Sequence, residues 1–490
     1  MNFPILARWQ PAVLLGLALL VGGFLRFAGL YDRLEPIHRE SELVILAHTR
    51  APDPPQAVET YGPGGRSAGP AVAWRRLLGI GREAIERGRL ASALAGVATI
   101  FACWWVARLL AGWQAASVAA GAYSIAPLAI VADRLALPVS TATLCAVLAA
   151  GCAILAYQRR RWPLALPGLA LLLVAALLHG SIAVAAVLAL PLAIALRNRP
   201  PQFVRSRYRV LGLIAGAAVV ATMLAVGFQR VAQGLLLVRN LGWTLVFDLP
   251  VGGWVLLAVG AYFVARHGTA AAKASGAAAA LLTAAAVLVG LPGGRGSAPA
   301  MLPAFALWIV AAASLTPRFV RSWHRLRADH QQRAVAVLLL VASLVAAPAL
   351  LLAARWSLDP ANAEIGPNEQ WEYQAGPESG VGCTSIVDAL RAASDKGPIT
   401  VAGLGSRHSC LRMRIVTESL PFTWQDDPPP RSQAPPLPAL PDGLHLAQTE
   451  YLVGQNPRAI APRGWEPIVR IRRPQGVYGY ALYRQSNPRR

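Results

Sequence analysis

Residues 11–30 have the sequence PAVLLGLALLVGGFLRFAGL, in which Arg26 is the one charged side chain. Crossing the hydrocarbon core of a bilayer takes about 20 predominantly apolar residues, so this run predicts a membrane-spanning helix. Similar runs recur as far as Ala354, and 55% of the chain is hydrophobic while 14% is charged. This composition, with a mean hydropathy of +0.45, argues against a soluble enzyme. The repetition of such runs also excludes a lone signal peptide.

The apolar runs predict a polytopic α-helical membrane protein with about eleven spans. We place these spans at 11–30, 90–111, 114–132, 137–157, 163–178, 181–196, 210–228, 250–265, 272–291, 300–315 and 334–353. The fifth and sixth spans are short and separated by a single turn, so one re-entrant hairpin or a differently counted pair is an alternative there. After residue 354 no run is long enough to span, which predicts a membrane domain, 1–354, and a soluble domain, 355–490.

The basic residues predict the orientation, because short cytoplasmic loops retain Arg and Lys. Seventeen of them fall on one side of the predicted spans, whereas the short loops opposite hold Arg134, Arg230, Arg239 and Arg295. We therefore expect a cytoplasmic N-terminus, with the first outer loop, 31–89, and the soluble domain outside. The soluble domain has 15 basic and 13 acidic residues, so most of the net charge of +22 belongs to the membrane domain. This charge indicates contact with anionic lipid rather than nucleic acid.

The acidic residues of the membrane domain lie mostly on the predicted outer side. Eight of the eleven are in the first outer loop, and Asp133 and Asp248 are also placed outside. Because charge is costly inside a bilayer, this distribution points to an outward-facing site. The loop also interleaves apolar residues, such as Val44 and Val72, with charged ones, such as Arg75. That pattern predicts short helices in the membrane interface.

Several short motifs resemble the GT-C class of membrane glycosyltransferases, and more narrowly the protein O-mannosyltransferases and aminoarabinose transferases. The first span ends in Phe24-Leu25-Arg26-Phe27 and is followed by His38-Arg39-Glu40-Ser41-Glu42. Similar landmarks come later, at 89–94, 126–127, 133–136, 295, 301–303 and 376–382. Two positions depart from the family pattern. Arg39-Glu40 stands where the family has Asp-Glu, and Leu137-Pro138-Val139-Ser140 stands where members often carry an Asp.

The resemblance implies a sugar transfer at the outer face of a bacterial inner membrane. Such enzymes take the sugar from a polyprenyl-phosphate donor and pass it, with inversion, to an acceptor whose hydroxyl a carboxylate deprotonates. Glu40 is the candidate base, and Glu42 is its substitute. Arg134 and Arg295 are the candidates that bind the donor phosphate, because Arg offers paired donors to phosphate oxygens. Asp133, next to Arg134, and Arg39, next to Glu40, are assigned to the acceptor side or to the loop itself.

Each assignment has a plainer alternative. Glu40 could be a solvated acid in an exposed pair with Arg39 or Arg26. Arg134 could pair with the adjacent aspartate or reach lipid headgroups, and Arg295, flanked by glycines, could belong to a flexible turn. For the whole chain, the alternatives are a GT-C-like protein without catalysis that binds a polyprenyl lipid or a partner and, ranked lower, a transporter. A lipid-linked donor makes a nucleotide cofactor unnecessary, and a divalent metal is left open.

The soluble domain is expected to be a small α/β unit. Its pattern predicts a helix over 384–394, a strand over 399–404 and a closing pair of strands over 468–473 and 478–483. The proline-dense stretch 426–441 predicts an extended linker.

The five cysteines divide according to the predicted topology. Cys103, Cys145 and Cys152 fall in predicted spans and are expected to pack there. Cys383 and Cys410 lie in the outer domain, where an oxidising compartment allows them to form a disulfide.

Overall fold

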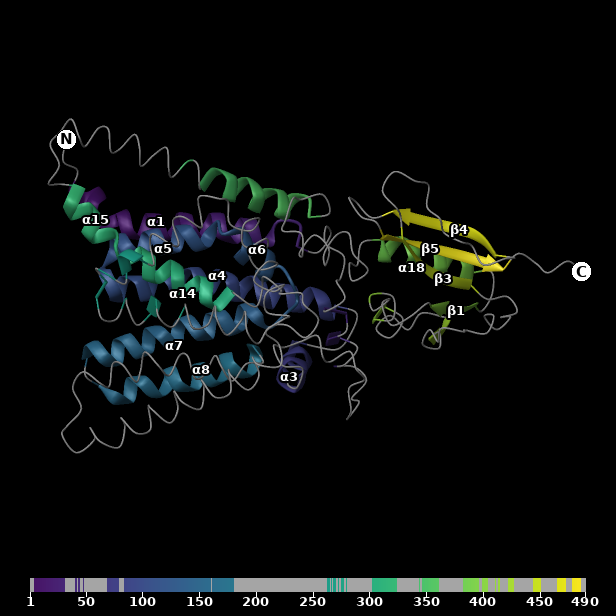
Figure 1. Cartoon of the computed structure of the whole chain (residues 1–490), viewed down its shortest axis with the longest axis horizontal. Helices are drawn as coiled ribbons and strands as arrows, with labels where there is room; N and C mark the ends of the chain where they lie inside the picture. Colours follow the sequence, from purple (N-terminus) through teal and green to yellow (C-terminus); the bar gives the residue numbers. More distant parts are fainter. Residues whose placement is uncertain are drawn as a thin grey trace, which may run out of the picture.

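The computed structural model describes twelve continuous stretches and a few isolated positions. The stretches are 4–30, 68–78, 83–159, 161–179, 302–323, 346–360, 382–395, 399–403, 422–426, 444–450, 465–472 and 478–485. The isolated positions lie within 40–47, 262–279 and 410–414, and at 343. The long helices form a bundle at one end of the molecule, and the strands form a sheet at the other (Figure 1). The chain therefore combines a helical part with a part that contains a sheet.

Four stretches among the described residues are long and apolar enough to cross a membrane. They are 9–27 in α1 (Pro4–Phe27), α4 (Ala84–Ala111), α7 (Val139–Arg159) and 302–322, which covers α14 (Leu302–Ala313) and most of α15 (Thr316–Trp323). Two shorter apolar helices are α8 (Ala165–His179) and 346–358. These helices bear out the prediction of a polytopic membrane protein.

The predicted number of spans stays a prediction, because several of them lie wholly or mostly outside the described residues. These are the spans 181–196, 210–228, 250–265, 272–291 and 334–353.

The third predicted span, 114–132, is a bent pair of helices rather than one straight helix. α5 (Trp113–Ser124) and α6 (Pro127–Asp133) meet at an angle of 61°. Pro127 takes the first turn of α6, where its missing N–H is tolerated, and it forces Ala126 into extended backbone with ψ of 116°. The break turns α6 and the residues after it toward the end of the bundle where the sheet lies (Figure 1).

Small residues allow the helices to pack closely, as is common in membranes. The buried core shared by α4, α5, α7 and α14 consists largely of alanine. Gly151 of α7 faces Trp105 of α4, and a Cβ at that position would overlap the indole ring. Gly22 of α1 leaves similar room for Ile100 of α4. The bundle is thus held by close contact of backbones and side chains.

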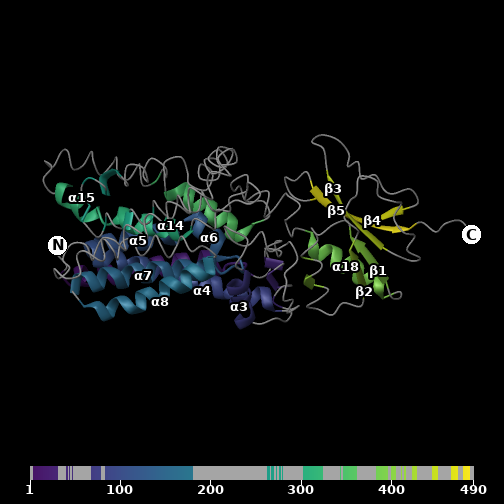
Figure 2. The ribbon, with the colours of Figure 1, turned by 60° about the horizontal axis from the view of Figure 1, so that its bottom comes forward.

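The first outer loop contributes α3 (Ala68–Leu78), which lies beside the beginning of α4 (Figures 1 and 2). This helix agrees with the prediction of short helices in the loop. Leu77 is 86% exposed, whereas Arg75 is fully buried. Both exposures are the reverse of those in a helix of a soluble protein, where the leucine would face the core and the arginine would face water.

The five strands form one mixed sheet in the order β2-β1-β3-β5-β4. β1 (Ile399–Gly403) pairs in parallel with β2 (Phe422–Asp426) and with β3 (Leu444–Glu450). β5 (Tyr478–Gln485) then pairs antiparallel with β3 and with β4 (Trp465–Arg472). The helix α18 (Cys383–Ser394) lies beside this sheet (Figure 2).

The tail elements predicted from the sequence are present, with two additions. α18, β1, β4 and β5 occupy the predicted positions to within a few residues, and β4 and β5 form the predicted closing pair. β2 and β3 were not predicted; they flank the proline-dense stretch on either side. They give the sheet its parallel edge.

Candidate functional site

One face of α4 carries the polar and small residues that build the candidate site. Arg89, Ser92, Gly96 and Thr99 are three or four positions apart and are all buried. This spacing brings them onto a single face of the helix. The face meets three segments that are distant in the sequence, namely the first outer loop, the end of α1, and the turn after α6.

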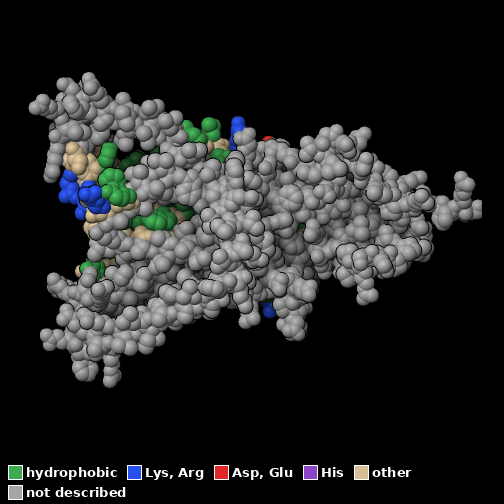
Figure 3. All heavy atoms as spheres, in the orientation of Figure 1, with side chains coloured by type: hydrophobic (Ala, Val, Ile, Leu, Met, Phe, Trp, Pro, Cys, Tyr) green, Lys and Arg blue, Asp and Glu red, His purple; other side chains and the backbone are tan. Residues whose placement is uncertain are grey.

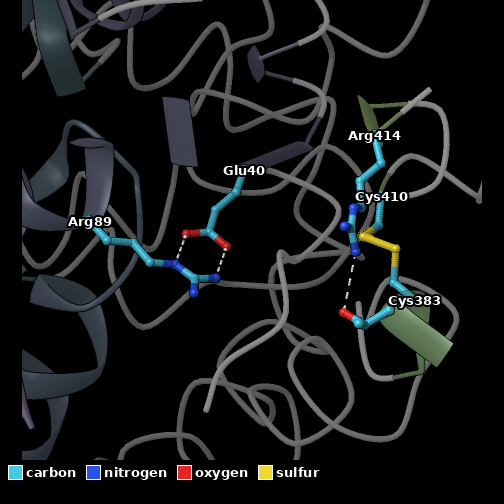
Figure 4. Close-up of a disulfide and its surroundings, with 6 residues drawn as sticks. Glu40, Arg89, Cys383, Cys410 and Arg414 are labelled. Carbon is cyan, nitrogen blue, oxygen red and sulfur yellow. Dashed lines mark hydrogen bonds and ion pairs between the residues drawn. A yellow bond between two sulfur atoms is a disulfide. The ribbon is translucent and has the colours of Figure 1, made fainter. Parts of the chain in front are cut away.

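Glu40 of the first outer loop is bound to Arg89 by two parallel hydrogen bonds. Arg89 Nε donates to Glu40 Oε1 at 3.0 Å, and Arg89 Nη2 donates to Oε2 at 2.8 Å. The backbone N–H of Ala136, in the turn after α6, donates to the same Oε1 at 2.6 Å. We call Glu40, Arg89 and the Ala136 N–H the outer clamp. Figure 4 shows its ion pair in one view with the disulfide.

The clamp leaves Glu40 fully buried, with a positive partner and a backbone donor. This burial contradicts the alternative of a solvated acid, and Arg26 is paired with Asp133 instead. The other expected partner, Arg39, lies outside the described residues. Bidentate arginine pairs are among the stronger hydrogen-bonded contacts in proteins, and they fix orientation as well as charge. The geometry therefore favours a role for Glu40 in holding the loop against α4. The sequence had named both residues in its motifs without predicting that they pair.

Further contacts hold the turn after α6 in place. Ser92 Oγ donates to the carbonyl of Leu137 at 2.9 Å, one residue after the clamp's Ala136. Arg75 of α3 is buried against Gly88 and Ala136, and a Cβ on Gly88 would overlap its guanidinium. The sequence analysis had placed Arg75 on the polar face of an interfacial helix. Its burial instead adds a second cation next to the clamp.

A second buried ion pair lies deeper in the bundle, between α1 and α6. Arg26 Nε donates to Asp133 Oδ2 at 2.8 Å, and both side chains are fully buried. The remaining donors of Arg26 bind backbone carbonyls of Gly22 at 3.0 Å, Ser124 at 3.2 Å and Tyr123 at 3.3 Å. Asp133 thus pairs with Arg26 and not with its neighbour in the sequence.

Gly96 of α4 makes room for this deeper pair. A Cβ at Gly96 would overlap the carboxylate of Asp133 and would lie 2.8 Å from Arg26 Nε. The pair joins α1 to α6 against α4, and it supports the helices from which the outer clamp is built. Asp133 accordingly makes structural contacts, and its assignment to the acceptor side or to the loop stays a prediction.

Arg134 closes the end of α1. Its Nη1 donates to the carbonyls of Leu25 at 3.1 Å, Arg26 at 3.4 Å and Ala28 at 2.6 Å, and its Nη2 donates to Gly29 at 3.1 Å. The last carbonyls of a helix have no partner within the helix, so a buried arginine satisfies them. The side chain is fully buried and also reaches the carbonyl of residue 357 at 3.3 Å. These contacts support a structural role for Arg134, and its assignment to the donor phosphate stays a prediction.

Three of the residues singled out in the sequence lie outside the described residues, namely Arg39, Glu42 and Arg295. Their assignments stay predictions. Among the residues that the structure does describe, no three His, Cys, Asp or Glu side chains come together as metal ligands. Both buried carboxylates of the site, Glu40 and Asp133, face an arginine. This donor set does not fit a metal ion.

The tail reaches the same region through a disulfide-linked segment. Cys383, the first residue of α18, is joined to Cys410, which is the pairing expected from the sequence. Met413, three residues further on, is buried in an apolar cluster with Val44, Ala84, Ile85 and Ala136. The cluster and the outer clamp thus share Ala136. Nothing in the sequence had indicated this contact.

Comparison with known proteins identifies the fold. No protein-family profile matches the sequence, and no curated protein matches it. By structure, the chain is similar to ArnT from Cupriavidus metallidurans in the apo state, with a TM-score of 0.53 and 14% identity over 97% of this chain and 98% of ArnT. ArnT bound to undecaprenyl phosphate matches with a TM-score of 0.49 and 15% identity over the same shares of both chains.

The chain is also similar to the apo oligosaccharyltransferase of Archaeoglobus fulgidus, with a TM-score of 0.51 and 15% identity over 85% of this chain. The chain spans 64% of the archaeal enzyme's length, which is less than two thirds of it. At these identities the likeness establishes the fold. The fold is similar to that of ArnT and of the archaeal oligosaccharyltransferase, in agreement with the GT-C-like fold that the sequence motifs indicated.

Proposed function

We propose that this chain transfers a sugar from a polyprenyl-phosphate-linked donor to an acceptor at the outer face of a bacterial inner membrane. The proposal is supported by the GT-C-like fold and by the motifs that resemble protein O-mannosyltransferases and aminoarabinose transferases. The observation that carries it is the outer clamp. In this clamp the acidic motif after the first span, at Glu40, is fixed against α4 and the turn after α6. An acidic motif held in a fixed position is what an ordered transfer site requires.

The proposed orientation places the clamp outside the cytoplasm. α15 lies at the end of the bundle away from the sheet, and basic side chains gather there, among them the exposed Arg318 and Arg321 (Figures 1 and 3). Basic residues favour the cytoplasmic side of a membrane. The opposite end, with the first outer loop, the clamp and the sheet, then faces the cell envelope.

In the proposed reaction, the acceptor hydroxyl attacks the anomeric carbon of the donor sugar. Its proton passes to a carboxylate, the bond from that carbon to the phosphate oxygen breaks, and the bonding electrons remain on the polyprenyl phosphate. We propose Glu42 as the base and Glu40 as the residue that positions the loop. Glu40 already accepts three hydrogen bonds and is fully buried. Glu42, the other acid of the motif and the substitute named from the sequence, is then the candidate that receives the proton.

The departing phosphate needs cations, and we propose Arg295 for this role, since the guanidinium of Arg134 is bound to backbone carbonyls. Arg39 adjoins the clamp in sequence, and we keep it as a residue of the loop or of the acceptor side. Arg75 holds positive charge in the same region, which lowers the energy of a phosphate dianion nearby.

A second candidate function is binding of a polyprenyl lipid without catalysis. One observation favours it. Arg39 stands where the resembled family has an aspartate, and the next acid, Glu40, is engaged by Arg89. A site whose carboxylate is held by an arginine would keep the fold and bind the lipid without a base.

The two functions are separated by assaying the purified full-length chain with a panel of polyprenyl-phosphate sugars. We expect release of polyprenyl phosphate from at least one donor, and loss of that release in Glu42→Gln. Glu83→Gln is the matched control, because Glu83 is 63% exposed and paired only with Arg87 among the described contacts. Turnover that persists in Glu42→Gln would remove Glu42 as the base. Saturable lipid binding without turnover of any donor would establish the second function.

A further inference from the structure

A short segment of the tail, residues 410–414, is held to α18 at two points. The first is the disulfide from Cys410 to Cys383, and the second is a hydrogen bond from Arg414 Nη1 to Thr384 Oγ1 at 3.4 Å (Figure 4). α18 itself buries one apolar face, which includes Val387. The segment is therefore tied to a packed helix at the edge of the sheet.

Between these two anchors, Met413 is 5% exposed and packs into the membrane domain. Its apolar cluster contains Val44 of the first outer loop, Ala84 and Ile85 at the start of α4, and Ala136 in the turn after α6. Methionine is flexible and polarisable, so it fits an irregular gap between several elements. One tail residue thus contacts a cluster drawn from all three segments that form the outer clamp.

The apolar cluster and the outer clamp are physically continuous. The N–H of Ala136 donates to Glu40 Oε1 at 2.6 Å, while the residue itself packs in the cluster of Met413. Ile85 lies four residues, about one turn, before Arg89 on α4. A shift of Met413 would change the packing of both elements that donate hydrogen bonds to Glu40.

We infer that Met413 is a positioning residue for the outer clamp, and that the Cys383–Cys410 disulfide acts on the clamp through it. The disulfide limits the conformational freedom of the segment, and the segment holds Met413 in its packing position against Ala136 and the start of α4. A displacement of the tail segment would then also displace the outer clamp. The packing contact of Met413 is observed in the structure, whereas its effect on turnover rests on the proposed transferase function.

The contact is tested by thiol labelling of Val44→Cys in the purified full-length chain. Val44 is 1% exposed in the cluster, so a maleimide should react slowly there. We expect Met413→Ala to speed the labelling of this cysteine by about tenfold or more, because removing a buried methionine opens its cluster locally. We expect Cys383→Ser/Cys410→Ser to have a similar effect, and Met413→Leu to restore slow labelling.

Leu77→Ala is the matched control, since it removes a side chain of similar size that is 86% exposed on the same outer side. Its labelling rate should equal that of the Val44→Cys parent. Unchanged labelling in Met413→Ala would overturn the inference, and so would acceleration by Met413→Ala without acceleration by the serine pair. This result does not depend on any sugar donor, so it is distinct from a failure of the proposed function.

The effect on the site is tested by kinetics in the same variants without the added cysteine. We expect Met413→Ala and the serine pair each to lower kcat, and the triple variant to be no slower than the slower of the two. Residues that act through one another give such non-additive effects. A protein merely destabilised at two separate places would show additive losses, and that outcome would overturn the coupling.

Discussion

Arg89 of α4 holds both carboxylate oxygens of Glu40, with Nε on Oε1 at 3.0 Å and Nη2 on Oε2 at 2.8 Å. The two residues are 49 positions apart, and both side chains are almost completely buried. A bidentate pair in such surroundings fixes the loop on the helix in one orientation. The position of the first outer loop, on which its proposed function depends, is therefore set by this contact.

Arg89→Ala is expected to lower the free energy of unfolding by about 3–5 kcal/mol, because it leaves the Glu40 carboxylate buried without its cation. Arg87→Ala, two residues away on the same helix, should change it by less than about 1 kcal/mol, since its pair with Glu83 is exposed. Denaturation of both variants in detergent, followed by tryptophan fluorescence, measures the difference. Equal losses would mean that the clamp does not contribute to stability as described.

Glu40→Gln and Glu42→Gln should differ in kinetics if Glu40 positions the loop and Glu42 is the base. Loss of a general base costs about 10²–10⁴-fold in rate, so we expect Glu42→Gln to lower kcat by that factor. Glu40→Gln keeps one oxygen for Arg89 and Ala136, and it should lower thermal stability more than it lowers kcat per folded molecule. The reverse order would assign the base to Glu40.

Gly96→Ala is expected to destabilise the bundle, because the added Cβ would overlap the Asp133 carboxylate in its pair with Arg26. Overpacking of this kind costs about 1–3 kcal/mol. Gly121→Ala in α5 serves as the control, since its Cβ would meet nothing within 4 Å. In that helix alanine should be neutral or stabilising by about 0.5–1 kcal/mol. Thermal unfolding of the two variants distinguishes them, and a stable Gly96→Ala protein would argue against the deeper pair.

Arg134→Gln should lower stability while leaving lipid binding per folded molecule unchanged. The side chain satisfies several buried carbonyls at the end of α1, so its loss is expected to cost about 2–4 kcal/mol. Titration with polyprenyl phosphate, measured below the unfolding temperature, reports the affinity separately. A loss of affinity for polyprenyl phosphate in a variant of normal stability would indicate that Arg134 binds the donor phosphate.

Removal of the disulfide with Cys383→Ser/Cys410→Ser should lower the stability of the tail by about 3 kcal/mol in the chain-entropy model, since the bond closes a loop between residues that are 27 positions apart. Limited proteolysis measures this loss as faster cleavage within that loop. The helices of the bundle should be cleaved at an unchanged rate. Unchanged cleavage of the loop would indicate that other contacts hold the segment.

The sequence predicted the parts of the fold that depend on local composition. Apolar runs predict membrane helices because a bilayer requires about 20 apolar residues, and this argument holds for α1, α4 and α7 without any tertiary information. The bend between α5 and α6 was missed, although Pro127 marks its position. The motif resemblance led to the GT-C-like fold, which structural comparison then confirmed.

The pairing of charges could not be predicted in the same way. Arg26 and Arg39 were the partners expected for Glu40 from the sequence, and nothing in the spacing pointed to Arg89, which is 49 positions away. Adjacent residues such as Asp133 and Arg134 suggest a pair, but neighbours along a helix point in different directions. Asp133 pairs with Arg26 of α1, and Arg134 binds carbonyls at and just after the end of α1.

By itself, then, the sequence determined that this chain is a polytopic membrane protein, because hydrophobicity and length act residue by residue. Tertiary structure decided which acids are available for chemistry, since burial and arginine partners depend on how distant helices pack. Glu40 is held by a residue 49 positions away, and Met413 reaches the same site from the tail. Such contacts are set by the packing of the whole molecule, which no local pattern encodes.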